Sequence, residues 1–310
     1  AQSSVTMYGQ VNTGYEYSKT DITTSRGVKT TTKKTGFQND QVKPSRLGFK
    51  GEEALGNGLS ATFALEMGFD SANGDFDSAF NRKATVGLKG AFGEVRVGKD
   101  SGTMNSFDGS FKAIDRTDSL AKIDDPDGRG PKVDLDAAYT PRPTGLIYNG
   151  SFSGFDVAAA IGNSSTRVKT DGVTTMKKDT ATYGLGMGYN GGAWAVGAAV
   201  QLDTEKTLSR DVKKTNYGVG ASYDFNVAKV YGQYKGGQYK NKMPAGDKYS
   251  YDQFAIGVSA PFGATTLSAE YGYNKAKETA AATAIVTKFK GNVFAVQAEY
   301  AFSKRTSLVA

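Results

Sequence analysis

The chain has 310 residues and a formal net charge of +7, with 39 glycines, 7 prolines, 17 tyrosines and 17 phenylalanines but neither cysteine nor histidine. The lack of cysteine excludes disulfides, thiolate metal sites and cysteine nucleophiles, and the lack of histidine excludes Ser-His-Asp catalysis and histidine-based metal sites. The excess of basic over acidic residues is compatible with acidic lipid or nucleic acid as a partner and requires neither.

Apolar and polar residues alternate with a period of two along most of the chain, which predicts β-strands. The clearest runs, in chain order, cover residues 59–69, 194–202, 217–225, 254–260, 267–273 and 294–302. In each run one face is apolar and the opposite face is mainly polar or small. Runs of about ten residues with this pattern are typical of transmembrane β-strands, and no stretch approaches the ~18 apolar residues of a transmembrane helix.

Very short and long polar connections alternate along the chain. The short connections are at residues 54–58, 90–93, 151–154, 191–192, 225–227 and 261–264. The long ones are at residues 18–41, 70–79, 163–179, 203–215, 238–249 and 274–290. This rhythm places all tight turns at one end of the strands, as in an outer-membrane barrel. A soluble β-sandwich shows the same alternation along its strands but seldom this regular asymmetry.

One connection is much longer than the others. Residues 100–140 carry nine acidic and five basic side chains, a net charge of −4, so the rest of the chain carries +11. A loop this long in a compact domain is usually functional or disordered. Folded into a lumen, an acidic loop facing a basic wall would set a transverse field across a narrow point. About fourteen strands are predicted before residue 302, and a fifteenth starts at Thr306. Barrels of about this size enclose a water-filled lumen, so the prediction is one β-barrel domain over residues 1–310.

Several segments, in chain order, resemble the Gram-negative general porins, particularly the beta-proteobacterial branch. They lie at residues 3–9, 45–53, 55–59, 80–90, 92–93, 97–98, 153–155 and 299–306. The resemblance implies a 16-stranded transmembrane barrel, a homotrimer, and a third external loop, here residues 99–144, that folds inward and narrows the pore. It also implies a complete last strand that ends in Phe. The sequence ends at Ala310, and we therefore expect one or two strands to be absent from it.

The resemblance also implies the residues of the pore constriction. Arg46 and Lys50 match the basic positions of the second strand, where Leu47 and Phe49 point to the other face. The remaining basic candidates are Arg82 and Arg142; Arg82 shares its phase with apolar residues, so its direction rests on the resemblance alone. The alternative is that these are ordinary hydrated lumen cations. The acidic loop candidates are Asp108, Asp115 and Asp118.

No cofactor is expected. A structural Ca²⁺ is the one alternative, because Asp124, Asp125 and Asp127 provide clustered oxygen ligands. This segment lacks the first acidic position and the bidentate Glu of an EF-hand loop. The glycines Gly184, Gly186 and Gly188 alternate within a predicted strand and open no helix, so they do not form a nucleotide-binding motif.

The predicted function is a passive diffusion channel for small hydrophilic solutes and ions in the bacterial outer membrane, with a mild preference for anions. Its expected surroundings are outer-membrane lipid and lipopolysaccharide, and no nucleic acid is expected. Lysines in the long connections could contact lipopolysaccharide or simply be solvated; they are Lys29, Lys33, Lys34, Lys177 and Lys178. The alternatives are a substrate-specific channel, a soluble binding protein, and a barrel-type outer-membrane enzyme, which the lack of histidine disfavours.

Overall fold

The computed structural model describes residues 3–23, 29–39, 43–76, 78–108, 110–114, 122–123, 133–134, 142–242, 246–280 and 285–310. Regular structure within these ranges is β-strand, apart from the short helix α1 (Thr103–Asp108). No helix of the described ranges is long and apolar enough to cross a membrane.

The main sheet has fifteen strands, and every neighbouring pair is antiparallel. In sheet order these are β1 (Ser3–Gln10), β4 (Arg46–Gly56), β5 (Leu59–Gly68), β6 (Lys83–Gly90), β7 (Gly93–Lys99), β10 (Thr144–Phe152), β11 (Phe155–Thr170), β12 (Val173–Asn190), β13 (Trp194–Thr207), β14 (Asp211–Asp224), β15 (Lys229–Asn241), β16 (Lys248–Phe262), β17 (Thr265–Ala280), β18 (Ile285–Ala301) and β19 (Ser307–Val309). The predicted fourteen strands and a fifteenth near residue 306 are confirmed. The separate hairpins are β2 (Thr13–Thr23) with β3 (Lys29–Asn39), and β8 (Lys122–Ile123) with β9 (Val133–Asp134).

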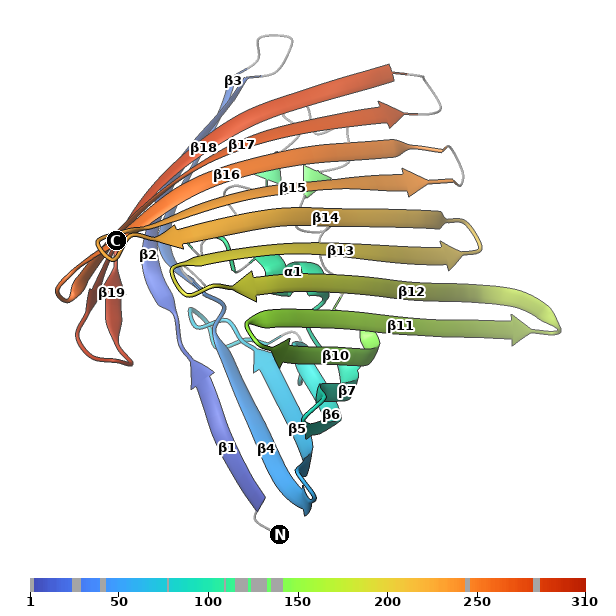
Figure 1. Cartoon of the computed structure of the whole chain (residues 1–310). Coiled ribbons are helices and arrows are strands. Elements are labelled where there is room, and N and C mark those ends of the chain that lie inside the picture. Colours follow the sequence, from blue (N-terminus) through green and yellow to red (C-terminus); the bar gives the residue numbers. More distant parts are fainter. Residues whose placement is uncertain are drawn as a thin grey trace.

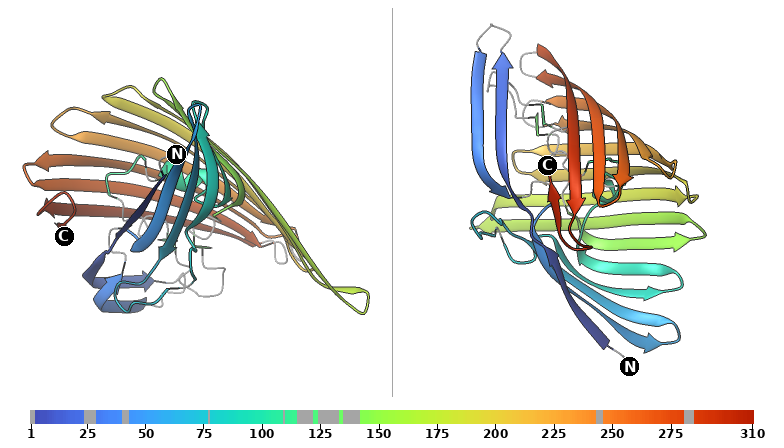
Figure 2. Two further views of the ribbon diagram at one scale, coloured as in Figure 1. Left: turned by 90° about the horizontal axis from the view of Figure 1, so that it is seen from below. Right: turned by 90° about the vertical axis from the view of Figure 1, so that its left-hand side faces the viewer.

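The sheet is strongly curved (Figures 1 and 2). Its two faces differ in polarity. On the inner face, Gln201 and Asn216 are 0% and 1% exposed. On the outer face, the apolar side chains of Phe294 and Val296 are 70% and 64% exposed. Polar side chains inside and apolar side chains outside is the reverse of the distribution in a water-soluble domain, because a large exposed apolar surface is unfavourable in water. The outer face is therefore built for an apolar environment.

The two ends of the strands also differ. At one end the turns are tight; Asn57 and Ser153, for example, adopt left-handed φ values of 52° and 50°. At the other end the polar segments are long, but strand pairing continues through most of their residues. β11 and β12 meet in a two-residue turn of Asp171 and Gly172, with φ values of 51° and 79°, and Asp-Gly favours such hairpin turns.

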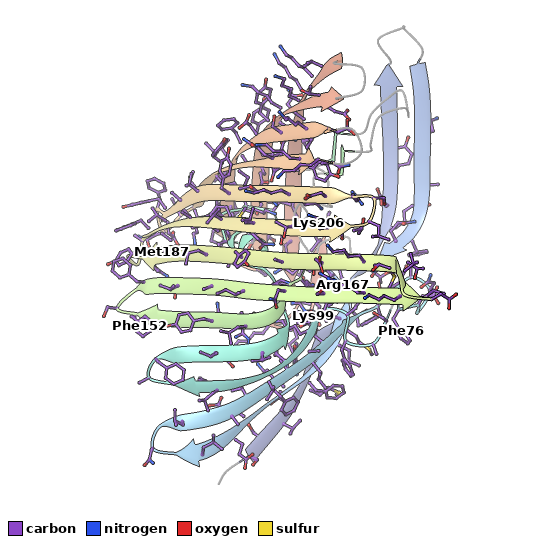
Figure 3. The ribbon with its side chains drawn as sticks, turned by 90° about the vertical axis from the view of Figure 1, so that its right-hand side faces the viewer. Phe76, Lys99, Phe152, Arg167, Met187 and Lys206 are labelled. Carbon is purple, nitrogen blue, oxygen red and sulfur yellow. The ribbon has the colours of Figure 1, made fainter. Side chains whose placement is uncertain are left out.

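Labelled side chains in Figure 3 mark these two ends. Phe152 and Met187 lie toward the tight turns, and Arg167 and Lys206 lie toward the polar hairpins. The polar segments predicted as loops at residues 163–179 and 203–215 are thus largely extended strands. Their many threonines favour extended backbone, because β-branched residues pack well on a pleated surface.

Helix α1 lies inside the curve of the sheet (Figure 1) and contacts β11, β12, β13 and β14. Its buried side chains, Met104 and Phe107, form a cluster with Phe111 of the following segment. Glycines of the wall allow this close approach: a Cβ on Gly218 would lie 2.5 Å from a ring carbon of Phe107, and one on Gly220 would lie 2.5 Å from Phe111. The inner wall is therefore shaped to receive this segment.

Candidate functional site

A basic cluster forms on the inner face where β4, β5 and the residue preceding β6 meet. Arg46 and Lys50 lie on the same face of β4, two residues either side of Gly48, and Gly48 is paired with Glu66 on β5. The guanidinium Nε of Arg46 lies 3.9 Å from Oε2 of Glu66, and Nε of Arg82 lies 2.7 Å from Oε1. Glu66 is only 4% exposed, so one buried carboxylate is shared by two arginines.

Tyr8 completes the support of Glu66. In the sheet register Tyr8 pairs with Gly48, and Gly48 pairs with Glu66, so the three residues lie in a row across three strands. The ring of Tyr8 covers Gly48, where a Cβ would lie 2.5 Å from the ring. Its hydroxyl donates to Oε2 of Glu66 at 2.9 Å. The ammonium of Lys50 lies 5.5 Å from the centre of the same ring, within cation–π range.

Arg142 joins the cluster from the segment that precedes β10. Its Nη1 donates to the carbonyl oxygen of Arg82 and to the hydroxyl of Ser101, each at 2.8 Å. Burial and the charge of Arg82 lower the pKa of Arg142, but an arginine remains protonated at neutral pH. Arg142 therefore contributes a fixed positive charge beside that of Arg82.

A second group of charged residues adjoins the first. Asp100 accepts from Lys83 and from Arg96, with N–O distances of 3.1 Å in both cases. Arg96 also donates at 2.7 Å to Glu94 and at 2.7 Å to the side chain of Asn149. Lys83, Arg96, Asp100 and Asn149 contribute to the lining of a cavity of about 220 Å³.

Both groups together carry a net positive charge. The cationic members are Arg46, Lys50, Arg82, Lys83, Arg96 and Arg142, and the anionic members are Glu66, Glu94 and Asp100. Six cations and three anions give a net charge of +3 at this part of the inner wall. Side-chain charges facing a pore determine which ions it admits, so the cluster can attract and orient small anions.

The segment after Asp100 runs across the interior to the opposite part of the wall. The backbone N–H groups of Ala113 and Ile114 donate to Oε2 of Glu270 on β17, at 2.9 Å and 3.2 Å. Glu270 is 2% exposed. In sheet order β17 lies far from β6 and β7, so this contact holds the segment at a second, distant point and places it across the space enclosed by the sheet.

The sequence-predicted residues can now be located. The structure brings together Arg46, Lys50, Arg82 and Arg142. Asp108 is the last residue of α1, and its side chain is outside the described part, as are Asp115, Asp118 and the three calcium candidates, Asp124, Asp125 and Asp127. Their roles stay predictions.

Strand alternation did not predict the direction of the Arg82 side chain, and the structure shows it. β6 begins at Lys83, so Arg82 precedes the strand and the phase of that strand does not apply to it. The backbone N–H of Arg82 bonds to the carbonyl of Glu66 at 3.1 Å, which turns the side chain toward the Glu66 carboxylate.

Sequence reasoning missed Glu66 and Glu270 as members of the site. The one feature of the sequence that could have identified them is that each lies on the polar face of an alternating strand. That signal is shared by many residues of the inner face, and only the register and the inward segment distinguish these two.

Comparisons with known proteins agree on one family. The family model described as "Gram-negative porin" matches residues 1–310. An outer membrane porin protein of Bordetella pertussis is 28% identical over 353 residues, covering 100% of this chain and 88% of that one. Outer membrane porin protein 32 of Delftia acidovorans is 32% identical over 278 residues, covering 85% and 72%. The solved structure titled anion-selective porin from Comamonas acidovorans has a TM-score of 0.73 and 24% identity, and the match covers 99% of this chain and 87% of that one.

Proposed function

The chain belongs to the Gram-negative porin family, and on that premise we propose that it is an outer-membrane diffusion channel whose constriction favours small anions. The outer-membrane location and the β-barrel channel architecture follow from the family and the structural likeness. The anion preference and the roles of individual residues are the proposed parts.

The single observation that carries the proposal is the net charge of +3 at the basic cluster. Arg46 and Arg82 lie beside a single buried carboxylate, Glu66, and Arg142 binds the main-chain carbonyl of Arg82. A permeating anion loses part of its hydration at a narrow point, and fixed cationic donors compensate for that loss. A cation meets the same charges as a barrier.

Fixed side chains make this compensation effective. The guanidinium of Arg82 is held by Glu66, and that of Arg142 is held by Ser101 and the Arg82 carbonyl. Arginine is weakly hydrated and offers planar arrays of N–H donors, so an anion can exchange water for these donors without first ordering flexible side chains. The inward segment held at Glu270 narrows the passage opposite the cluster.

The relatives support the proposal in general terms. The Comamonas acidovorans porin is titled anion-selective, and we extend that property to this chain on the strength of its own basic cluster. We further propose that the protein is a homotrimer without catalytic activity. Analytical ultracentrifugation in detergent tests the first point, with one mass of three chains as the expected result.

Solute uptake into liposomes tests the proposed function. Liposomes that contain the purified protein should swell faster with a small carboxylate than with an amine of similar size, and both should exceed protein-free liposomes. Equal rates for the two charged solutes would contradict the anion preference, and no swelling at all would contradict the channel. Saturation at low concentration of one solute would instead support a substrate-specific channel.

A further inference from the structure

One strand of the main sheet has an unpaired edge near the tip of the β11–β12 hairpin. β10 pairs with β11 only as far as Gly162, so residues 163–170 of β11 have β12 on one side and no strand of the described part on the other. All residues from 163 to 170 are exposed, and the hairpin projects beyond its neighbours in Figure 1. We call residues 163–170 the bare edge.

A proline explains why the pairing with β10 stops. Extending the register beyond Gly145 and Gly162 places Pro143 opposite Ser164. Proline has no N–H to donate to a strand ladder, and the carbonyl of Pro143 instead accepts from the N–H of Asp100 at 3.2 Å. The chain therefore leaves the sheet at Pro143 and joins the pore segment, and the outward N–H and C=O groups of the bare edge are exposed to solvent.

The two faces of the bare edge differ in chemistry. Arg167 and Lys169 share the strand phase of Ile161, whose apolar side chain is exposed on the outer face. Val168 has the opposite phase, and its register partner on β12 is Met176; both side chains are about half exposed. A strand that joined this edge would therefore meet basic side chains on one face and an apolar pair on the other.

The two basic residues of the bare edge are not neutralised, unlike the other lysines of this hairpin. Lys177 lies 3.2 Å from Asp179, and Lys178 lies 3.4 Å from Glu205. These two lysines, predicted from the sequence as candidate lipopolysaccharide contacts, are therefore paired within the protein. Within the described ranges, no carboxylate lies within ion-pair distance of the basic residues of the bare edge. The uncompensated positive charge of the hairpin thus lies on its unpaired strand.

The bare edge is accessible from outside the cell. On outer-membrane barrels the tight turns face the periplasm and the longer connections face outward. The strand from Ile161 to Thr170 spans about 30 Å, and beyond Ile161 its residues are mainly Ser, Thr, Asn and basic. This composition does not continue the apolar band, so the bare edge extends past the membrane into the external solvent.

We propose that the bare edge binds an extended acidic segment of an extracellular protein, which adds to the sheet as a further strand. An unpaired strand edge is a template for such pairing, and the main-chain hydrogen bonds supply the affinity. Opposite charges directly across two strands stabilise a sheet. Carboxylates facing Arg167 and Lys169, with apolar side chains on the face of Val168, therefore give the preferred sequence, in which acidic and apolar residues alternate.

Charge also decides between this partner and a second copy of the chain. In the antiparallel registers that overlap two bare edges most fully, Arg167 of one copy lies directly or diagonally opposite Arg167 of the other. Like charges in such positions destabilise a sheet, and charged side chains on an edge strand prevent self-pairing. With an acidic strand the same charges become favourable. This role depends on the external position of the hairpin and not on the anion preference of the pore.

Peptide binding to the full-length protein in lipid nanodiscs tests the proposal. The probe is a fluorescent peptide, as long as the bare edge, in which glutamate alternates with valine. Each control peptide changes one property of the probe. In the first, lysine replaces glutamate and reverses the charge; in the second, N-methylvaline replaces valine and removes N–H donors; in the third, glutamates and valines stand in separate blocks. Anisotropy measures the affinity, and hydrogen exchange locates the bound peptide.

Two double variants of the protein complete the test. Arg167→Gln with Lys169→Gln removes the charge of the bare edge. Lys177→Gln with Lys178→Gln is the matched control, because it removes the same charge from ion-paired positions of the same hairpin. Conductance of each preparation shows separately whether the channel itself is intact.

The wild type and the control variant should bind the alternating acidic peptide, and the amides of residues 163–170 should become protected from exchange. The bare-edge variant should bind it roughly tenfold more weakly, since two cross-strand ion pairs are lost. The three control peptides should bind the wild type more weakly than the probe does.

Several results would overturn the proposal. They are no binding at about 1 mM peptide, equal binding of any control peptide, equal binding by the bare-edge variant, and protection confined to other strands. Self-association of the protein through the bare edge in the absence of peptide would also overturn it, because a second copy would then be the occupant.

Discussion

Arg82 is bound to Glu66 through both its main chain and its side chain. Its N–H donates to the Glu66 carbonyl at 3.1 Å, and its guanidinium Nε donates to the Glu66 carboxylate at 2.7 Å. Glu66 also receives the hydroxyl of Tyr8. This double connection places a cation on the inner wall immediately before β6, where strand alternation alone does not determine its direction.

Replacing Glu66→Gln should increase anion preference while it weakens the fold. The change removes the carboxylate shared by Arg46 and Arg82, so the net charge of the basic cluster rises by one. The permeability ratio of chloride to potassium should rise roughly two- to fivefold. Loss of the charge-assisted hydrogen bonds should lower the free energy of unfolding by about 2 kcal/mol.

Reversal potentials and urea unfolding in liposomes check these two effects. Tyr8→Phe is the matched control, because it removes one hydrogen bond to Glu66 and no charge. It should cost about 1 kcal/mol of stability and leave the permeability ratio near that of the wild type. A fall in anion preference in Glu66→Gln would contradict the assigned role of this carboxylate.

Glu270 should act as an acceptor that holds the inward segment. In Glu270→Gln, an amide oxygen can still accept from the N–H groups of Ala113 and Ile114, so single-channel conductance should stay close to wild type. In Glu270→Ala no acceptor remains, and about 3 kcal/mol of hydrogen bonding is lost. Conductance should become larger and noisier, because the segment is released from the wall.

The control for this pair is Glu299→Ala, an acidic position on the neighbouring strand whose register partner is Thr266. It removes the same charge without removing an acceptor used by Ala113 or Ile114. Identical effects of Glu270→Gln and Glu270→Ala would mean that charge rather than anchoring is what matters at this position.

Gly218→Ala should displace Phe107. A Cβ at this position would lie 2.5 Å from the Phe107 ring, and overpacking of this kind costs about 1–3 kcal/mol. The midpoint of thermal unfolding should fall, and the conductance should change because α1 shifts. Gly232→Ala is the control, since a Cβ there meets nothing within 4 Å. Equal behaviour of the two variants would contradict the close fit between α1 and the wall.

Adjacent residues of β18 test the assignment of the two faces. Val296 is 64% exposed on the outer face, and the following Gln297 belongs to the opposite phase. Val296→Lys should destabilise the protein folded in liposomes by about 2–4 kcal/mol, whereas Gln297→Lys should cost less than about 1 kcal/mol. Urea titrations of both variants measure the difference. A larger loss of unfolding free energy in Gln297→Lys would mean that the outer and inner faces have been assigned the wrong way round.

Much of the architecture follows from local patterns in the sequence. The alternation around Phe254, Ile256 and Val258 places these side chains on the outer face, and the tight turn at Asn57 begins the regular rhythm of connections. Arg46 and Lys50 could be assigned to one face because Leu47 and Phe49 occupy the other. These inferences need only the two-residue period of a strand.

The remaining features depend on contacts between distant segments. The glycines of the inner wall give no local signal of their role; Gly184, for instance, makes room for Thr103. Glu66 and Glu270 are two polar residues among many on alternating strands, and their roles emerge from the register and from the path of the inward segment. Polar hairpins such as residues 163–179 were predicted as loops because Lys, Thr and Asp lack an apolar face, yet cross-strand pairing still extends them.

The reversal potential across a potassium chloride gradient tests the central claim most directly. It should be measured in planar bilayers for the wild type, for Arg46→Gln with Arg82→Gln, and for Lys206→Gln as an outer-face control. The account predicts a reversal potential close to the chloride equilibrium potential for the wild type and the control. In the double variant, whose cluster falls from a net charge of +3 to +1, the reversal potential should shift toward the potassium equilibrium potential. A wild-type reversal potential on the potassium side of zero, or no shift in the double variant, would contradict the proposed anion preference.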